Sequence, residues 1–215
     1  MGKLKLYWKR YSYVVLLAFI LLGLFDMRFA LAAVICMAGP IIVSFWKGRY
    51  WCGNLCPRGS LYDSLISKIS RNRKIPAFFK SNYLRIIMVL FIMTMFGYGL
   101  YKNWGNPYGI GMVFYKINVI TSIVGIVLGV IYSRRTWCSF CPMGTIASFI
   151  SRKRNSSRVL KVSNSCVSCK LCAKSCPLGL VPYEYKGDLL SHPDCIQCGS
   201  CITACPKRAI GYNDR

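Results

Sequence analysis

The sequence predicts a two-part fold: an all-α membrane domain with four transmembrane helices in two duplicated hairpins, followed by a small α+β domain. Three observations predict it: four long apolar stretches, a Trp-Cys…Cys-Pro motif that occurs twice, and a dense run of cysteines near the C-terminal end. Of the 215 residues, 54% are hydrophobic, and the mean hydropathy is +0.40. This composition is too apolar for an ordinary soluble domain or a disordered basic tail. We expect the membrane domain at residues 1–158 and the second domain at residues 159–215.

The four apolar stretches have the length and composition of membrane spans. At 1.5 Å per residue, a helix of about 18 residues reaches about 27 Å, close to the ~30 Å hydrocarbon core. The alternative, buried helices of a soluble protein, is disfavoured by charge-free runs of this length. No small-residue cleavage site follows the first stretch, so we expect it to be retained as a helix. The predicted spans are residues 11–25, 29–46, about 84–101 and about 117–132.

Two features mark the edges of the third and fourth spans. Arg85 stands at the edge of the third span, where its long side chain is expected to snorkel toward the interface. The segment KNWGNPYGIG, residues 102–111, is rich in turn residues and is predicted to be the loop between the two spans.

The strong positive charge follows the predicted topology. Lys and Arg number 29 against 6 Asp and Glu, for a formal net charge of +23. The basic residues gather before the first span, between the second and third, and after the fourth, whereas the opposite loops hold only Arg28, Lys102 and Lys116. The positive-inside rule then places both termini in the cytoplasm of a multi-pass protein of the inner (cytoplasmic) membrane. Basic collars of this kind attract anionic lipid, so the charge does not indicate a nucleic-acid partner.

The cysteines of the C-terminal segment have the spacing of a metal-cluster motif. Four of them form C-x2-C-x2-C-x3-C-P, and the pattern recurs 29 residues later. This run is typical of bacterial ferredoxins with two [4Fe–4S] clusters, in which the fourth cysteine of each run ligates the other cluster. The predicted ligand sets are Cys166, Cys169, Cys172 and Cys205 for one cluster, and Cys195, Cys198, Cys201 and Cys176 for the second.

Other uses of these cysteines fit less well. Zinc sites use two cysteine pairs and need neither the third cysteine nor the Pro-capped fourth. Disulfides are disfavoured in the reducing cytoplasm. The single histidine, His192, is expected to be a loop residue, and one His is too few for a bis-His haem. Gly199 suits a tight loop with positive φ, and Lys170 stands at the equivalent place in the first run.

A second set of cysteines follows the second and fourth spans. The segments GRYWCGNLCPRGSLYDSLISK and SRRTWCSFCPMGTIASFISRK align with one gap. Positions after even-numbered spans fall on the same membrane face, so all four thiols are expected at the cytoplasmic surface. The aligned pairs are Arg49 with Arg135, Trp51 with Trp137, Cys52 with Cys138, Cys56 with Cys141, and Gly59 with Gly144.

Three uses of this second set stay open at the level of sequence. Cys52, Cys56, Cys138 and Cys141 together could ligate a third iron or iron–sulfur centre, since soft thiolates suit iron. They could instead form a redox-active thiol site, or simply end helices and pack. Cys36, alone in the second span, is expected to be a small buried hydrophobe.

The motifs WCGNLCP and WCSFCP after paired spans, with the double cysteine run behind them, resemble the polytopic membrane ferredoxins of the NapH, NosR and CcoG type. The NapH-like plan, with four spans and cytoplasmic clusters, is the most similar, although WCSFCP has two residues between its cysteines where that family usually has three. The resemblance implies a membrane electron carrier between a cytoplasmic donor or the quinone pool and a respiratory partner, as a component of a quinol dehydrogenase or another oxidoreductase.

The expected partners are an acidic ferredoxin or flavodoxin, membrane oxidoreductase subunits, and a quinone. One alternative function is an assembly or metal-reducing accessory factor of a respiratory complex, which would use the same chain of iron–sulfur centres. Another is a redox-sensing membrane regulator.

Overall fold

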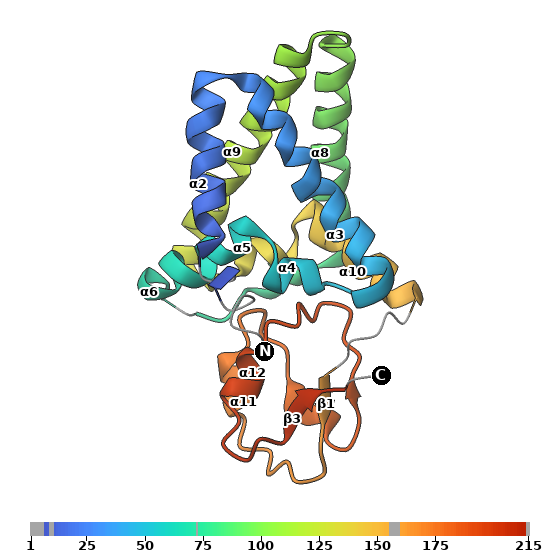
Figure 1. Ribbon diagram of the computed structural model, residues 1–215. Coiled ribbons are helices and arrows are strands. Elements are labelled where there is room, and N and C mark those ends of the chain that lie inside the picture. Colours follow the sequence, from blue (N-terminus) through green and yellow to red (C-terminus); the bar gives the residue numbers. More distant parts are fainter. Residues whose placement is uncertain (1–6, 9–10, 72, 155–159, 214–215) are drawn as a thin grey trace.

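The computed structural model describes residues 7–8, 11–71, 73–154 and 160–213, and most of them are helical. Long helices stand on one side of a layer of short helices, and the C-terminal segment lies on the other side (Figure 1). We call residues 7–154 the helical part and residues 160–213 the tail domain. The boundary predicted between residues 158 and 159 lies outside the described residues.

The helical part consists of α-helices joined by short 3-10 and π segments. In chain order they are α2 (Tyr13–Phe25), η1 (Met27–Ala32), α3 (Ala33–Lys47), α4 (Tyr50–Asn54), α5 (Pro57–Leu61), η2 (Tyr62–Ile66), α6 (Ser67–Ile69), α7 (Ala77–Lys80), α8 (Asn82–Lys102), α9 (Pro107–Ile131), η3 (Thr136–Ser139) and α10 (Pro142–Arg154).

Among the described residues, three helices are long and apolar enough to cross a membrane: Arg28–Lys47, which joins η1 to α3, and the helices α8 and α9. In α8 no residue is buried against the rest of the described chain. Leu90 and Phe91 are 62% and 58% exposed. Apolar side chains in this number need a covering other than water, and these helices are therefore compatible with a location in the membrane.

The first predicted span is shorter than the other three. Helix α2 covers 13 residues, fewer than a membrane-crossing helix needs by itself. The helical hydrogen bonding begins earlier, however, because the Ser12 amide donates to the Trp8 carbonyl at 2.9 Å. Its side chains are strongly apolar, and Phe25 at its end is 88% exposed.

The loop predicted at residues 102–111 is wrong in its second half. Helix α9 begins at Pro107, so only residues 103–106 connect the two long helices. The Asn106 side chain accepts hydrogen bonds from the amides of Tyr108 and Gly109, at 3.1 and 3.3 Å. An Asn cap followed by Pro at the first helical position is a strong helix start. The residues taken for turn signals are therefore the capping signal of a helix that starts ten residues before the predicted one.

The tail domain is a small α+β unit around a three-stranded antiparallel sheet of order β2-β1-β3. The central strand pairs Leu160 with both Leu190 and Tyr212. Buried Leu160, Val162, Leu190 and Ile210 form its core together with several cysteines. The elements are β1 (Leu160–Val162), α11 (Leu171–Ser175), η4 (Pro182–Tyr185), β2 (Leu189–Leu190), α12 (Ser200–Thr203) and β3 (Ile210–Tyr212).

Each short helix of the tail domain starts after a residue in the left-handed conformation. Gly199 has φ 80° ahead of α12, as predicted, and Lys170 has φ 64° ahead of α11. A non-glycine residue adopts this conformation at a cost of about 1–2 kcal/mol. The turn at Lys170 is therefore a strained counterpart of the glycine turn.

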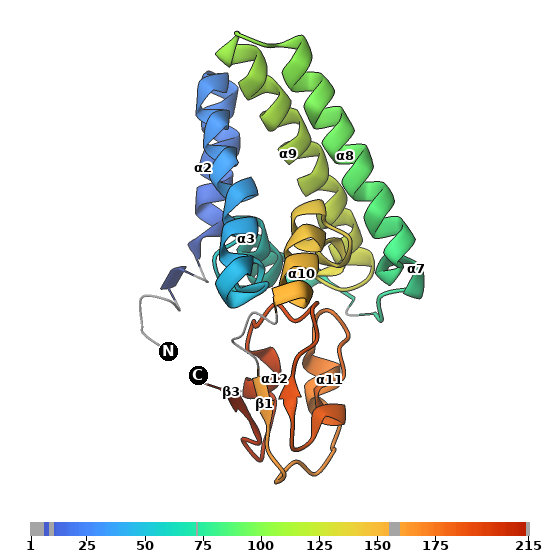
Figure 2. The ribbon, with the colours of Figure 1, turned by 90° about the vertical axis from the view of Figure 1, so that its right-hand side faces the viewer.

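The tail domain docks on the helical part through two of its cysteine-bearing loops. In Figure 2, α10 lies between the long helices and the tail domain. The Asn54 side chain donates to the Gln197 carbonyl at 3.3 Å, and the Ser133 hydroxyl donates to the Pro177 carbonyl at 2.8 Å. A Cβ added to Gly53 would lie 1.9 Å from the Ile196 carbonyl oxygen. Helix α4 can therefore approach this loop only because residue 53 has no side chain.

We predict that Gly53→Ala loosens this junction. The added methyl group meets a backbone oxygen, and overpacking of this kind costs about 1–3 kcal/mol. Gly97→Ala in α8 is the matched control, because nothing lies within 4 Å of its added Cβ. Thermal unfolding in detergent should show a melting temperature several degrees lower for Gly53→Ala and an unchanged or slightly higher one for Gly97→Ala. Equal melting temperatures would contradict the close approach.

Candidate functional site

The tail domain contains two cavities, each lined by four cysteines. The outer cavity is lined by Cys166, Cys169, Cys172 and Cys205. The inner cavity is lined by Cys176, Cys195, Cys198 and Cys201. In both, three closely spaced cysteines of one run meet the Cys-Pro cysteine of the other run. The four thiols around each cavity are a donor set suited to an iron–sulfur cluster.

The two cavities differ in their access to solvent. Cys169 is exposed at the outer cavity, and its neighbour Val167 is 60% exposed. The inner cavity is walled by Leu160, Leu190 and Ile196, all of them buried. The outer cavity thus opens toward solvent, whereas the inner one lies beneath the loops that dock on the helical part.

Backbone amides point at the Cys-Pro sulfurs in both cavities. The Leu180 amide donates to Cys176 Sγ, and the Ala209 amide donates to Cys205 Sγ, each at 3.3 Å. Each donor stands four residues after its cysteine. Hydrogen bonds of this kind stabilise negative charge on a ligating sulfur and raise the reduction potential of a bound cluster.

Burial disfavours ionisation of the thiols at the inner cavity. It raises the pKa of Cys195 and of Cys201 to about 12. Without a bound cation these groups therefore stay protonated at neutral pH, and binding of a metal cluster releases their protons.

The four cysteines of the Cys-Pro motifs line a single cavity of about 150 Å³ in the helical part. They are Cys52, Cys56, Cys138 and Cys141. The cavity continues between α3, α8 and α9, where its lining is mostly apolar. Burial raises the pKa of Cys56 to about 12 and raises those of Cys52 and Cys138 as well. Cys36, expected to be buried, is instead exposed and lines the same cavity.

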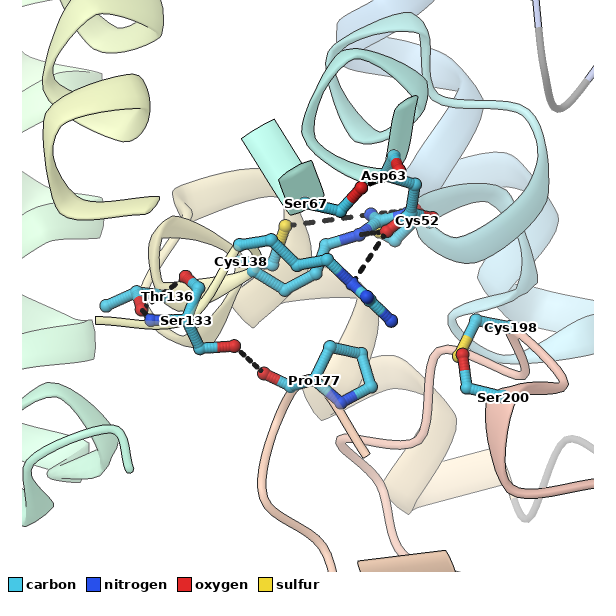
Figure 3. Close-up of polar contacts among 11 residues, drawn as sticks. Cys52, Asp63, Ser67, Ser133, Thr136, Cys138, Pro177, Cys198 and Ser200 are labelled. Atoms are coloured by element: carbon cyan, nitrogen blue, oxygen red, sulfur yellow. Dashed lines mark hydrogen bonds and ion pairs between the residues drawn. The ribbon is translucent and has the colours of Figure 1, made fainter. Parts of the chain in front are cut away.

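Two buried arginines connect the Cys-Pro motifs reciprocally. Arg49 Nη2 donates to the Cys138 carbonyl at 2.7 Å, and Arg135 Nη1 donates to the Cys52 carbonyl at 2.8 Å. Their side chains are 1% exposed. Each arginine therefore reaches the first cysteine of the other motif. Figure 3 shows Cys52, Asp63 and Cys138 around this crossing.

The motif glycines provide the space for this crossing. A Cβ on Gly59 would lie 2.5 Å from Arg135 Nη1, and a Cβ on Gly144 would lie 2.5 Å from Arg49 Nη2. The arginine of each motif thus lies against the glycine of the other motif.

Sequence reasoning missed a second set of matched glycines. Gly39 in α3 leaves room for the Trp51 ring, which lies 2.5 Å from an added Cβ. Gly125 in α9 leaves room first for the Tyr62 hydroxyl and then for Trp137, which lies 3.3 Å from an added Cβ. Each glycine stands twelve residues before its tryptophan. This equal spacing is a signal that the alignment could have used, had it been extended backward into the spans.

The two buried arginines have different carboxylate partners. Arg135 forms a bidentate pair with Asp63 of the helical part, at 3.1 and 2.7 Å. Arg49 Nη1 pairs with Asp194 of the tail domain at 3.1 Å. Arg85 also pairs with Asp194, at 3.1 and 2.8 Å, so the expectation that it snorkels to the lipid interface is wrong. Its side chain instead turns toward the carboxylate at the domain junction.

Asp194 is held in its charged form. Burial alone would raise its pKa, but Arg49 and Arg85 outweigh that effect and place the pKa below its ordinary value. His192, expected to be a loop residue, accepts a hydrogen bond from the Asp194 amide at its Nδ1, at 3.1 Å.

Among the described residues, no group of three or more His, Cys, Asp or Glu side chains is placed to hold one metal ion. In a cubane cluster each thiolate binds a different iron at a different corner, so its ligands stand farther apart than those of a single ion.

We predict that Arg135→Gln destabilises the helical part strongly. Removing one partner of a buried ion pair leaves the other uncompensated and costs about 3–5 kcal/mol. Arg134→Gln is the control, because Arg134 pairs with the same Asp63 at 3.3 Å but is 25% exposed, and such pairs contribute about 0–1 kcal/mol. Thermal unfolding in detergent compares the two. Similar losses for both variants would contradict the role given to Arg135.

Comparison with known proteins identifies iron–sulfur domains in both parts of the chain. A family model described as a 4Fe-4S binding domain matches residues 29–76 and 116–160, which include both Cys-Pro motifs. A family model described as a 4Fe-4S dicluster domain matches residues 165–210. Two uncharacterized proteins of Methanocaldococcus jannaschii, MJ0749 and MJ0750, are 28% and 26% identical to the chain over 152 residues, covering 69% and 64% of it. The matches span 59% and 62% of these relatives' own lengths. No solved structure matches the chain.

The matched domains and the many cysteines support the same chemistry as the cavities. The protein is a mostly helical iron–sulfur binding protein with ferredoxin-type domains, and these domains indicate a role in electron transfer.

Proposed function

We propose that this protein is a membrane-bound iron–sulfur carrier that relays electrons between a cytoplasmic donor or the quinone pool and a respiratory partner. The observation that carries the proposal is the succession of three cavities, each lined by at least four cysteines, from the outer end of the tail domain to the helical part. A [4Fe–4S] cluster, when bound, supplies a one-electron carrier at each place.

The outer cavity is suited to exchange with a soluble partner. Lys207 lines it, and exposed Lys170 and Arg208 adjoin the lining residues Cys169 and Lys207 in the chain. Complementary charge speeds encounters between proteins. An acidic ferredoxin or flavodoxin fits this face.

The inner cavity is positioned to connect the outer one with the helical part. Its loop residues Ile196 and Gln197 touch α4, which carries Cys52. The carbonyl of Pro177, next to Cys176, accepts a hydrogen bond from Ser133, which stands just before the second Cys-Pro motif. Both sides of this cavity are therefore fixed to the segments that bear the third set of cysteines.

For the cysteines of the two Cys-Pro motifs, which we call the third set, a bound cluster fits better than a redox-active thiol site or a purely structural role. Reactive thiols need a lowered pKa. Burial raises the pKa of Cys52, Cys56 and Cys138, which argues against a redox thiol pair. The 4Fe-4S binding domain matched to both motifs supports a third [4Fe–4S] site on Cys52, Cys56, Cys138 and Cys141.

The cavity of the third set also reaches toward the bilayer side of the helical part. Tyr62 lines it and is fully buried, and its Oη has no hydrogen-bond partner among the described residues. Arg58 and Asn118 form a further polar pair in the lining. A quinone head group or a membrane subunit of a respiratory enzyme fits such a mostly apolar site with few polar groups.

The membrane arrangement that we propose has four spans and two cytoplasmic termini, as in the NapH-like plan. The three long apolar helices and the apolar α2, whose helix is already hydrogen-bonded at Trp8, support it. It places the tail domain and both Cys-Pro motifs on the basic, cytoplasmic side.

We predict that anaerobically purified wild-type protein holds about twelve iron and twelve sulfide per chain, as three cubanes require. The double variant Cys52→Ser/Cys138→Ser should fall to about eight of each and keep the tail-domain signals in its electron paramagnetic resonance spectrum. Cys36→Ser, in the same cavity, is the matched control and should keep all twelve. A colourless protein, or one that binds only zinc, would refute the proposed function. Unchanged iron in the double variant would refute the third site alone.

We predict further that reporter fusions map residues 70 and 156 to the cytoplasm and residue 104 to the opposite side. Active alkaline phosphatase, which needs the periplasm, should be obtained only at residue 104. Activity at residue 156 would contradict the four-span arrangement.

A further inference from the structure

The carboxylate of Asp194 belongs to the tail domain, but its partners belong to the helical part. It accepts from Arg49 Nη1 at 3.1 Å, from Arg85 at 3.1 and 2.8 Å, and from the Ser148 hydroxyl at 3.1 Å. These partners come from the segment before α4, from α8 and from α10. One side chain thus joins the tail domain to three separate elements.

Comparison of the two Cys-Pro motifs shows what this carboxylate replaces. Asp63 stands seven residues after Cys56 and pairs with Arg135. Seven residues after Cys141 the second motif has Ser148, which carries no charge. Each arginine reaches across to the other motif, so Arg49 would find its carboxylate on the second motif. The residue at that position is Ser148. Asp194 of the tail domain supplies this carboxylate instead, and it accepts a hydrogen bond from the Ser148 hydroxyl.

We propose that Asp194 is the positioning residue that locks the tail domain onto the Cys-Pro site, by supplying the carboxylate that the second motif lacks. The inference deepens the proposed function and rests on it, because it concerns how the inner cysteine set is held against the third. Asp194 directly precedes Cys195, so fixing its side chain fixes the loop that carries Cys195 and Cys198.

The charges of these residues favour the docked arrangement of the tail domain. Arg49 is 1% exposed and Arg85 13% exposed, and both depend on Asp194 for their pairing with a carboxylate among the described residues. Withdrawal of the tail domain would leave two cations side by side without the carboxylate that pairs with both, which is unfavourable. Arg135 keeps Asp63 in either arrangement, so it stabilises the helical part but not the docking.

Three full-length variants in detergent separate docking from local stability. Asp194→Asn removes the charge. The double variant Ser148→Asp/Asp194→Ser moves the carboxylate to the helical part, where it can pair with Arg49 without joining the domains. Asp188→Asn is the matched control, because Asp188 is an exposed aspartate of the same domain whose carboxylate accepts from its neighbour's amide.

Two readouts are measured on each: amide hydrogen exchange of residues 196–198 and 50–54, and the magnetic interaction between reduced clusters in electron paramagnetic resonance. Exchange at residues 196–198 should rise about tenfold or more in Asp194→Asn and in the double variant. The double variant should recover the melting temperature that Asp194→Asn loses, yet still lack the magnetic interaction between the inner and Cys-Pro clusters. Asp188→Asn should behave like wild type in both measurements.

The inference is overturned if Asp194→Asn exchanges like Asp188→Asn, or if the double variant keeps wild-type exchange at residues 196–198. Iron content is measured on the same samples. Protein without iron would defeat the proposed function, yet the exchange data would still decide whether Asp194 holds the domains together. Full iron content with unchanged exchange would defeat the inference alone.

Discussion

Two buried arginines cross between the Cys-Pro motifs and tie them together at the junction with the tail domain. Each guanidinium reaches the carbonyl of the other motif's first cysteine, at 2.7 and 2.8 Å. A buried cation without a partner is strongly unfavourable, so each needs a carboxylate nearby. That need accounts for Asp63 within the helical part and for Asp194 at the junction. It also accounts for glycine at positions 59 and 144, where a side chain would collide with the guanidinium.

The same arrangement gives the cysteines their chemical setting. The crossing holds the two motifs face to face, so that their four cysteines share one cavity. Burial makes thiolates without a cation unfavourable there, as it does at the inner cavity of the tail domain. Sites of this kind favour a bound iron–sulfur group over free reactive thiols. The tail domain, docked by its loop at residues 196–197, then places the inner cavity beside α4, which carries Cys52.

Local patterns in the sequence predicted the parts of the site that depend on spacing. The double cysteine run, the left-handed Gly199 and the matched Arg, Trp, Cys and Gly of the two motifs all come from short-range patterns. The start of α9 was missed because Pro and Asn signal both turns and helix caps, and only the chain that follows decides between them. The pairing of Arg49 with Asp194 joins residues 145 positions apart, and no periodicity records such a contact. The sequence did contain one sign of this contact, because the first motif has Asp63 where the second has the uncharged Ser148.

We propose that three sets of four cysteines each hold a cubane cluster, and Mössbauer spectroscopy of the anaerobically purified, ⁵⁷Fe-enriched chain is the decisive measurement. We expect all iron to appear as [4Fe–4S] clusters, at about twelve iron per chain, with one third of the signal lost when Cys52 and Cys138 are both replaced by serine. A spectrum dominated by mononuclear iron, or one that the loss of both cysteines leaves unchanged, would contradict it.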